Sequence, residues 1–169
     1  MSNYHDRFPV KNWSLAGRTV LITGGTGSFG QAMTKLLLDT QNLHAVRIFS
    51  RGEFAQEEMR ERFGNDSRLR FLIGDVRDRV RLTAALRGVD YVFHAAALKQ
   101  VLAAEYNPTE FLETNAIGSR NVVDTAALAG VKKVLLISTD KAVHPSTLYG
   151  ATKMVAERVF IQGSVTHPQ

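Results

Sequence analysis

The sequence predicts an α/β protein built on a doubly wound parallel sheet, in a three-layer α/β/α arrangement. Short and nearly continuous apolar runs alternate along the chain with longer stretches of helical period. Such runs are typical of strands buried on both faces of a parallel sheet, and their alternation with helices implies right-handed crossovers. A glycine-rich turn between the first strand and the first helix supports the same fold class.

Five strands and five helices are expected. The strands are predicted at 19–23, 45–49, 69–73, 91–93 and 134–137, and the helices at 29–39, 53–63, 79–87, 107–129 and 149–161. Asp78 is expected to cap the third helix, while Gly88 and Gly130 are expected to end helices. The domain is predicted to span residues 18–162, between an amino-terminal arm at 1–17 and a frayed tail at 163–169.

Composition excludes several kinds of site. The chain has 169 residues, 44% hydrophobic and 22% charged, which suits one globular domain. Cysteine is absent, so disulfides and thiolate metal sites are excluded, and we expect no metal. No apolar run approaches the roughly 20 residues that span a bilayer, and residues 1–11 lack the apolar core of a signal peptide. We therefore expect a cytoplasmic protein that does not bind membranes.

The charge favours a phosphate-bearing ligand. The formal net charge is +5 and the pI is near 9.7, so the surface attracts phosphates. Arginines are dispersed, and those at 60–70 interleave with acidic residues, as on a solvated face. A mononucleotide or dinucleotide is therefore expected as ligand, rather than nucleic acid.

The turn at residues 23–30, with the sequence TGGTGSFG, is typical of a dinucleotide-binding Rossmann domain. Gly24 allows the tight turn, Gly27 lets the backbone approach a diphosphate, and Gly30 lets the helix pack against the strand. The helix N-terminus offers free N–H groups to the phosphates. A glycine-rich turn without a ligand is the alternative. The candidate cofactor-binding residues here are Gly24, Thr26, Gly27, Ser28, Phe29 and Gly30.

The end of the second strand favours NADP over NAD. Ser50 and Arg51 occupy the place where an acidic residue would bind the adenosine ribose of NAD, and a guanidinium pairs with a 2′-phosphate. Arg51 could instead be an exposed helix-start residue, and Glu53 could serve a ribose hydroxyl. After the fourth strand, the small side chains of Ala95, Ala96 and Ala97 would let the backbone lie against the nicotinamide ribose. His94 is interpreted as a packed strand-end residue rather than a catalyst.

Tyr149 and Lys153 form the candidate chemical pair. Residues i and i+4 share a helix face, so the ammonium can lie near the phenol and favour the phenolate. Tyr149 could then take a hydroxyl proton while hydride leaves the same carbon, and Lys153 could also hold the ribose. The residues Ser-Thr-Asp-Lys at 138–141 follow the fifth strand, where open α/β sheets bind ligands. A solvent-exposed helical Tyr and Lys is the alternative interpretation.

Seven stretches together resemble one family. They lie at 23–30, 50–53, 73–78, 94–101, 104–108, 138–143 and 149–153. These motifs are similar to those of the inverting UDP-N-acetylglucosamine 4,6-dehydratases, which are extended short-chain dehydrogenase/reductases of polysaccharide and flagellin-sugar biosynthesis. The resemblance covers residues 16–162.

The resemblance implies roles for individual residues. Tyr149 would be the base at sugar C4, Thr139 would hydrogen-bond the C4 oxygen, and Lys141 would remove the C5 proton. Asp140 would protonate the departing C6 hydroxyl. Lys99 would face the substrate. Asp75 and Val76 would contact adenine. An ordinary turn aspartate at Asp75 and a strand-end ion pair of Asp140 with Lys141 are the alternatives.

The chain also departs from the family. Leu102 replaces a usual proline, and His144 and Thr147 replace usual asparagines, so the substrate is open. Family members continue well beyond residue 169, so we expect only the amino-terminal, cofactor-binding half, with the substrate lobe missing and dehydratase turnover weak or absent. A shortened sheet would expose an apolar edge, which predicts a homo-oligomer.

Three functions follow from these motifs. The first is NADP-dependent dehydration of a UDP-N-acetylhexosamine to a 4-keto-6-deoxy sugar, with the UDP-sugar bound if the site is complete. The second is nucleotide-sugar 4-epimerisation or reduction by Tyr149 and Lys153. The third is a non-catalytic NADP-binding module.

Overall fold

A parallel five-stranded sheet forms the centre of the protein in a computed structural model, which describes residues 14–167. The strands are β1 (Thr19–Thr23), β2 (Ala45–Ser50), β3 (Leu69–Ile73), β4 (Tyr91–His94) and β5 (Lys133–Leu136). Their order is β3-β2-β1-β4-β5, and all four pairings are parallel. Strand order reverses direction between β1 and β4, which confirms the predicted doubly wound sheet.

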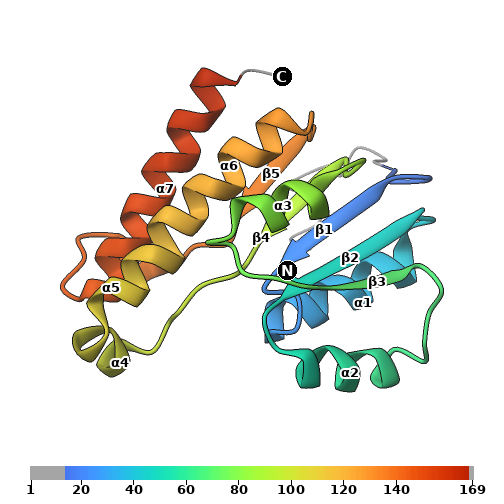
Figure 1. The fold of residues 1–169 in the computed structure, drawn as a ribbon, viewed down its shortest axis with the longest axis horizontal. Helices are drawn as coiled ribbons and strands as arrows, with labels where there is room; N and C mark the ends of the chain where they lie inside the picture. The colour runs from blue at the N-terminus through green and yellow to red at the C-terminus, as the bar shows by residue number, and fades with distance from the viewer. Residues whose placement is uncertain (1–13, 168–169) are drawn as a thin grey trace, which may run out of the picture.

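Helices cover both faces of the sheet (Figure 1). On one face lie α1 (Ser28–Thr40) and α2 (Glu53–Arg62); on the other lie α3 (Arg79–Leu86), α6 (Gly118–Leu128) and α7 (Leu148–Thr166). The connection from β4 to α6 contains α4 (Val101–Tyr106), α5 (Pro108–Phe111) and a π-helix, η2 (Leu112–Ile117). A 3₁₀ turn, η3 (Asp140–Ala142), follows β5. The three-layer prediction is therefore confirmed.

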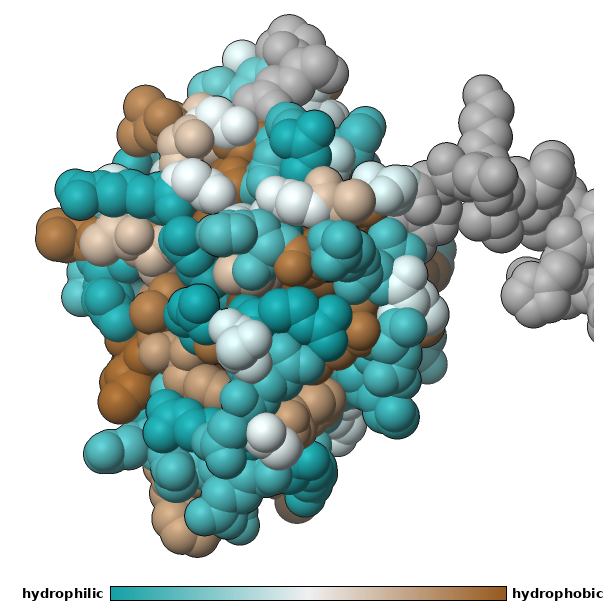
Figure 2. All heavy atoms as spheres, turned by 90° about the vertical axis from the view of Figure 1, so that its right-hand side faces the viewer, coloured by the Kyte–Doolittle hydropathy of each residue, from teal (hydrophilic) through white to brown (hydrophobic). Residues whose placement is uncertain are grey.

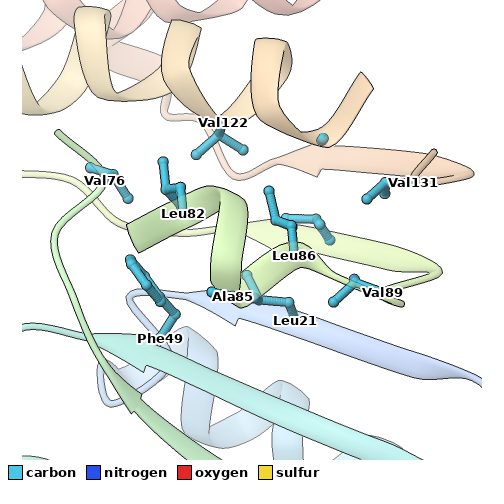
Figure 3. Close-up of a cluster of buried hydrophobic side chains, with 11 residues drawn as sticks. Leu21, Phe49, Val76, Leu82, Ala85, Leu86, Val89, Val122 and Val131 are labelled. Carbon is cyan, nitrogen blue, oxygen red and sulfur yellow. The ribbon is translucent and has the colours of Figure 1, made fainter. Parts of the chain in front are cut away.

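Alternate residues of β1 point into two separate cores. Leu21 packs with Leu82, Leu86 and Val122 of α3 and α6 (Figure 3). Val20 and Ile22 belong to the opposite cluster, beneath α1 and α2. Because both faces of β1 are buried, its side chains are apolar at consecutive rather than alternate positions.

The predicted helix at 107–129 is wrong in its details. The segment is helical, but Leu112–Ile117 widens into a π-helix, and α4 precedes it without having been predicted. The side chain of Asn115 is held inward by hydrogen bonds to both Leu98 backbone groups, at 2.8 and 2.9 Å, and to Thr152. Asn115 thus bonds to residues outside the helix at the point where the helix widens. The apolar period of the sequence does not reveal such contacts.

Helix ends agree with the predicted capping residues. The Asp78 carboxylate accepts the Arg81 N–H at 2.9 Å, and Gly88 and Gly130 end helices with φ of +68° and +70°. The last helix, α7, continues to Thr166, five residues beyond its predicted end at residue 161, and the domain boundary at residue 162 stays a prediction.

The arm prediction falls mainly on residues 1–13, which lie outside the described part of the chain. Leu15, just inside the described part, is buried in the same hydrophobic cluster as Val20 and Leu43. At the other side of the sheet, β5 is an edge strand, and Leu135 is 54% exposed. The expected exposed apolar edge is therefore present, while oligomerisation remains a prediction.

The surface drawn in Figure 2 is mostly hydrophilic, with hydrophobic residues in small groups between the polar ones. Within residues 14–167, no helix is both long and apolar enough to span a membrane. The same residues contain no cluster of three or more His, Cys, Asp or Glu side chains that could hold a metal ion.

Candidate active site

A cleft of about 660 Å³ lies at the carboxyl ends of the strands, beside the point where the strand order reverses. Most predicted site residues line it: Gly24, Thr26, Gly27, Phe29, Ser50, Arg51, Asp75, Val76, Ala95, Ala96, Ala97, Lys99, Tyr149 and Lys153. Its lining also includes residues that were not predicted as site residues, namely Phe49, Gly52, Gly74, Thr114, Ile137 and Ser138. The predicted Ser28, Gly30, Thr139, Asp140 and Lys141 are not part of the lining.

Glycines shape the turn that opens the cleft. Gly24 has φ of +65°, and a Cβ there would lie 2.7 Å from the backbone nitrogen of Ala96. A Cβ on Gly30 would clash with the Gly25 carbonyl, so a glycine at this position lets α1 pack closely against the turn. Gly27 is the N-cap of α1 and provides no side-chain cap. The first amides of α1, which begins at Ser28, are therefore available to an anion.

The polar end of the cleft carries Ser50, Arg51 and Asp75. The hydroxyl of Ser50 is buried and accepts a hydrogen bond from the Gln56 amide at 3.0 Å. Arg51 is 3.9 Å from the Asp75 carboxylate, and its side chain is 53% exposed. Burial alone would raise the pKa of Asp75, but hydrogen bonds from Arg77 and the charges of Arg77 and Arg51 together lower it. Asp75 therefore stays ionised beside an accessible guanidinium.

The other end of the cleft carries Tyr149 and Lys153 on the first turns of α7. Lys153 is only 3% exposed, and its ammonium donates to the Ile137 carbonyl at 2.8 Å. Burial lowers the pKa of Lys153, against the opposing charge of Glu157. Tyr149 is 9% exposed and packs in a cluster with Ala104 and Phe111. Both side chains are thus fixed at the cleft wall, and the alternative of a solvent-exposed pair is wrong.

The remaining predicted catalytic residues lie on the exposed η3 turn. The Thr139 hydroxyl donates to Asp140 at 2.9 Å, and the Lys141 ammonium lies 3.6 Å from the same carboxylate oxygen. The hydrogen bond from Thr139, followed by the charge of Lys141, lowers the pKa of Asp140. The side chains of Asp140 and Lys141 are 88% and 53% exposed. This chain does not enclose them, and their chemical roles remain predictions.

Thr114 is the most informative residue that sequence reasoning missed. It lies in the π-helix and lines the cleft, and it is 4% exposed. Its Oγ1 is the only buried side-chain oxygen or nitrogen without a hydrogen-bond partner among residues 14–167. Buried hydroxyls are normally paired, and π-helices are frequent at functional sites. No sequence pattern identifies Thr114 as a site residue, because its significance depends on the absence of a hydrogen-bond partner in the folded structure.

Known proteins match most of this chain in sequence. The chain is 50% identical over 145 residues to an inverting UDP-N-acetylglucosamine 4,6-dehydratase of Campylobacter jejuni, covering 86% of this chain and 43% of that protein. It is 47% identical over 147 residues to a UDP-glucose 4-epimerase of Rickettsia akari, covering 85% of this chain and 43% of that protein. The chain thus spans less than half the length of these relatives.

A solved structure extends the similarity to the fold. The dTDP-glucose 4,6-dehydratase DesIV of Streptomyces venezuelae, solved with NAD and TYD bound, matches with a TM-score of 0.81 and 29% identity. The match covers 88% of this chain and 52% of DesIV. The family model described as polysaccharide biosynthesis protein matches residues 20–168. The chain therefore belongs to the polysaccharide biosynthesis protein family, and the predicted resemblance is confirmed.

Proposed function

We propose that this chain binds NADP and forms the cofactor-binding part of an enzyme that removes water from a UDP-N-acetylhexosamine, giving a 4-keto-6-deoxy sugar. The observation that carries the proposal is the single cleft shared by the glycine turn and the Tyr149–Lys153 pair. A dinucleotide needs an anion site for its central diphosphate and a ribose site on either side of it, and this cleft offers candidates for each.

The cleft residues fit such a cofactor. A Cβ at Gly24 would meet the backbone of Ala95 and Ala96, so only glycine lets the turn lie this close to the loop after β4, and the α1 amides have no side-chain cap. Thr114 lines the same cleft, and its buried hydroxyl has no hydrogen-bond partner among residues 14–167. We expect the Thr114 side chain to rotate toward a bound dinucleotide, which would give the hydroxyl a partner and remove an unpaired polar group that destabilises the fold.

NADP is proposed over NAD because of Arg51. Its guanidinium is half-exposed at the end of β2, where the adenosine ribose is expected. DesIV was solved with NAD, so nicotinamide dinucleotides as a class are supported more directly than the 2′-phosphate.

Replacement of Arg51 by Gln should separate the two cofactors. We expect the Kd for NADP⁺ to rise at least about tenfold, because a charge-assisted hydrogen bond to a phosphate contributes about 1.5–3 kcal/mol. The Kd for NAD⁺ should change by less than about twofold, since NAD⁺ lacks the 2′-phosphate. Calorimetric titration of both dinucleotides measures this. Arg60→Gln, on α2 in an exposed pair with Glu57, is the matched control. Equal losses of affinity for NADP⁺ and NAD⁺ would show that Arg51 does not discriminate between the two cofactors.

Replacement of Thr114 by Val should stabilise the free protein and weaken the complex. Removing the unpaired hydroxyl should raise the free energy of unfolding by about 1 kcal/mol, while the dinucleotide Kd should rise about tenfold. Thr125→Val is the control, because the buried Thr125 hydroxyl already donates to Asn121 O at 2.6 Å. It should not gain stability and should bind normally. Urea unfolding and calorimetry give the two readouts, and unchanged affinity in Thr114→Val would remove Thr114 from the site.

The proposed chemistry assigns proton transfers to this chain's residues. The bound dinucleotide supplies the hydride acceptor and donor. Tyr149 takes the proton of the sugar C4 hydroxyl, and Lys153 holds the nicotinamide ribose and favours the phenolate. Lys141 takes the C5 proton, which the C4 ketone acidifies, and Asp140 protonates the departing C6 hydroxyl. The last two roles require that the η3 turn be covered when substrate binds, because both side chains are exposed in this chain.

The second candidate is 4-epimerisation, which needs Tyr149 and Lys153 but not the η3 residues. It is favoured by the relationship to the Rickettsia protein and by the position of Asp140 and Lys141 outside the cleft. A non-catalytic NADP-binding module is the third candidate. Incubation with UDP-N-acetylglucosamine and NADP⁺ distinguishes them, with mass spectrometry to detect loss of water and proton NMR spectroscopy to report the configuration at C4. Loss of water supports dehydration, a C4 epimer of unchanged mass supports epimerisation, and dinucleotide binding without product supports the module.

A further inference from the structure

His94 ends β4, and its imidazole is enclosed by three other elements. The side chain is 1% exposed, and its ring stacks on Phe160 of α7 with centroids 5.7 Å apart and planes 5° from parallel. Nδ1 lies 2.6 Å from the Thr23 hydroxyl of β1, and Nε2 lies 3.1 Å from the Ser119 hydroxyl of α6. Both ring nitrogens therefore have a partner.

The neighbouring hydrogen bonds fix the tautomer of His94. The Ser119 hydroxyl donates its one hydrogen to the Asn115 carbonyl at 2.5 Å, so toward His94 it can only accept. Nε2 must then carry the ring hydrogen, and Nδ1 must be the acceptor. Thr23 accordingly donates to Nδ1, and a lone pair of the same hydroxyl accepts the Ala96 N–H at 3.3 Å.

These bonds form one unbroken chain between two elements of the cleft wall. The chain starts at Ala96, which lines the cleft in the loop after β4, and ends at the carbonyl of Asn115, next to Thr114 in the π-helix. We infer that His94, as its Nε2–H tautomer, is a positioning residue that holds the loop after β4 and the π-helix in the arrangement that binds the dinucleotide. This inference rests on the proposed function.

The surroundings keep His94 in this one-proton form. Burial, followed by the charge of Lys153, lowers the pKa of His94 to about 3. The groups that contact the ring from β1, α6 and α7 are Thr23, Ser119 and Phe160, which carry no charge. A second proton on Nδ1 would face the hydrogen of the Thr23 hydroxyl and break the chain there.

Two amide substitutions each keep one half of the chain. In His94→Asn the side-chain oxygen can replace Nδ1 as acceptor for Thr23, whereas in His94→Gln the amide nitrogen can replace Nε2 as donor to Ser119. We expect both variants to bind NADP⁺ more weakly than wild type, with the Kd raised about threefold in His94→Asn and about tenfold in His94→Gln, since only His94→Asn retains the bond that supports Ala96. Equal affinities in the two variants would overturn the inference.

The tautomer itself is measurable in the wild-type protein. Long-range ¹H–¹⁵N spectra of the imidazole, assigned through the backbone of β4, should show Nε2–H and no titration between pH 5 and pH 8. An Nδ1–H tautomer, or protonation within that range, would overturn the inference even if neither variant folds. Wild-type protein that binds neither NADP⁺ nor NAD⁺ would instead refute the proposed function, and the spectrum would still report the tautomer.

Discussion

Replacement of Gly24 by Ala should abolish detectable dinucleotide binding and lower the free energy of unfolding by about 3 kcal/mol. A left-handed backbone costs a residue with a Cβ about 1–2 kcal/mol. The new methyl group would also lie 2.7 Å from the Ala96 nitrogen, which belongs to the backbone and has no flexible side chain to move aside. Relief of this contact must separate the turn after β1 from the loop after β4, and these two segments form the cleft.

The control for this substitution is Gly17→Ala. Gly17 has nearly the same φ, +69°, but a Cβ there would have no neighbour within 4 Å. It should therefore lose only about 1–2 kcal/mol of stability and bind NADP⁺ as wild type does. Urea unfolding and calorimetry on both variants separate the cost of the left-handed backbone, which both share, from the cost of the clash with Ala96, which only Gly24→Ala has. Normal NADP⁺ binding by Gly24→Ala would show that the two segments do not form the dinucleotide site.

Replacement of His94 by Asn should remove a large part of the acid sensitivity of the fold. The pKa of His94 is about 3 in the folded protein, below its ordinary value of 6.5. As pH falls below 6.5, the unfolded chain takes up this proton first, so the folded state loses stability down to about pH 3. This one group should lower the free energy of unfolding by on the order of 4 kcal/mol across that window.

The measurement is the free energy of unfolding of wild type minus that of His94→Asn, from urea titrations between pH 3 and pH 7. Carboxylates common to both proteins cancel in this difference, so it should fall as pH decreases through 6.5 and level off near 3. At neutral pH this difference should equal the stability that the hydrogen bonds of His94 provide and that His94→Asn loses. Parallel pH profiles for the two proteins would contradict a buried, neutral His94.

The regular part of the fold could be predicted from local pattern. The limits of β1 and β3 match their predicted residues, because each strand coincides with a short run composed mostly of apolar or β-branched residues. The glycine turn was recognisable because the need for Gly24 and Gly30 is local: the chain must turn tightly between strand and helix. Tyr149 and Lys153 were recognisable because helical spacing places them on one face.

The remainder depends on contacts between distant segments. Asn115 pairs with Leu98 and Thr152, 17 and 37 residues away, and neither partner changes the apolar period that predicts a helix. The importance of Thr114 depends on the absence of a partner, which a sequence cannot show. Asp140 and Lys141 illustrate the opposite case: a recognisable motif placed them in the chemistry, but in this chain they lie on an exposed turn.

The most direct test of the proposed cofactor site is a crystal structure of this chain grown with saturating NADP⁺. It should show the diphosphate against the backbone amides of residues 24–30, the 2′-phosphate beside Arg51, and the nicotinamide ribose in contact with Tyr149 and Lys153. A structure in which NADP⁺ binds elsewhere, or in which side chains fill the turn and leave no room for the diphosphate, would contradict the proposal.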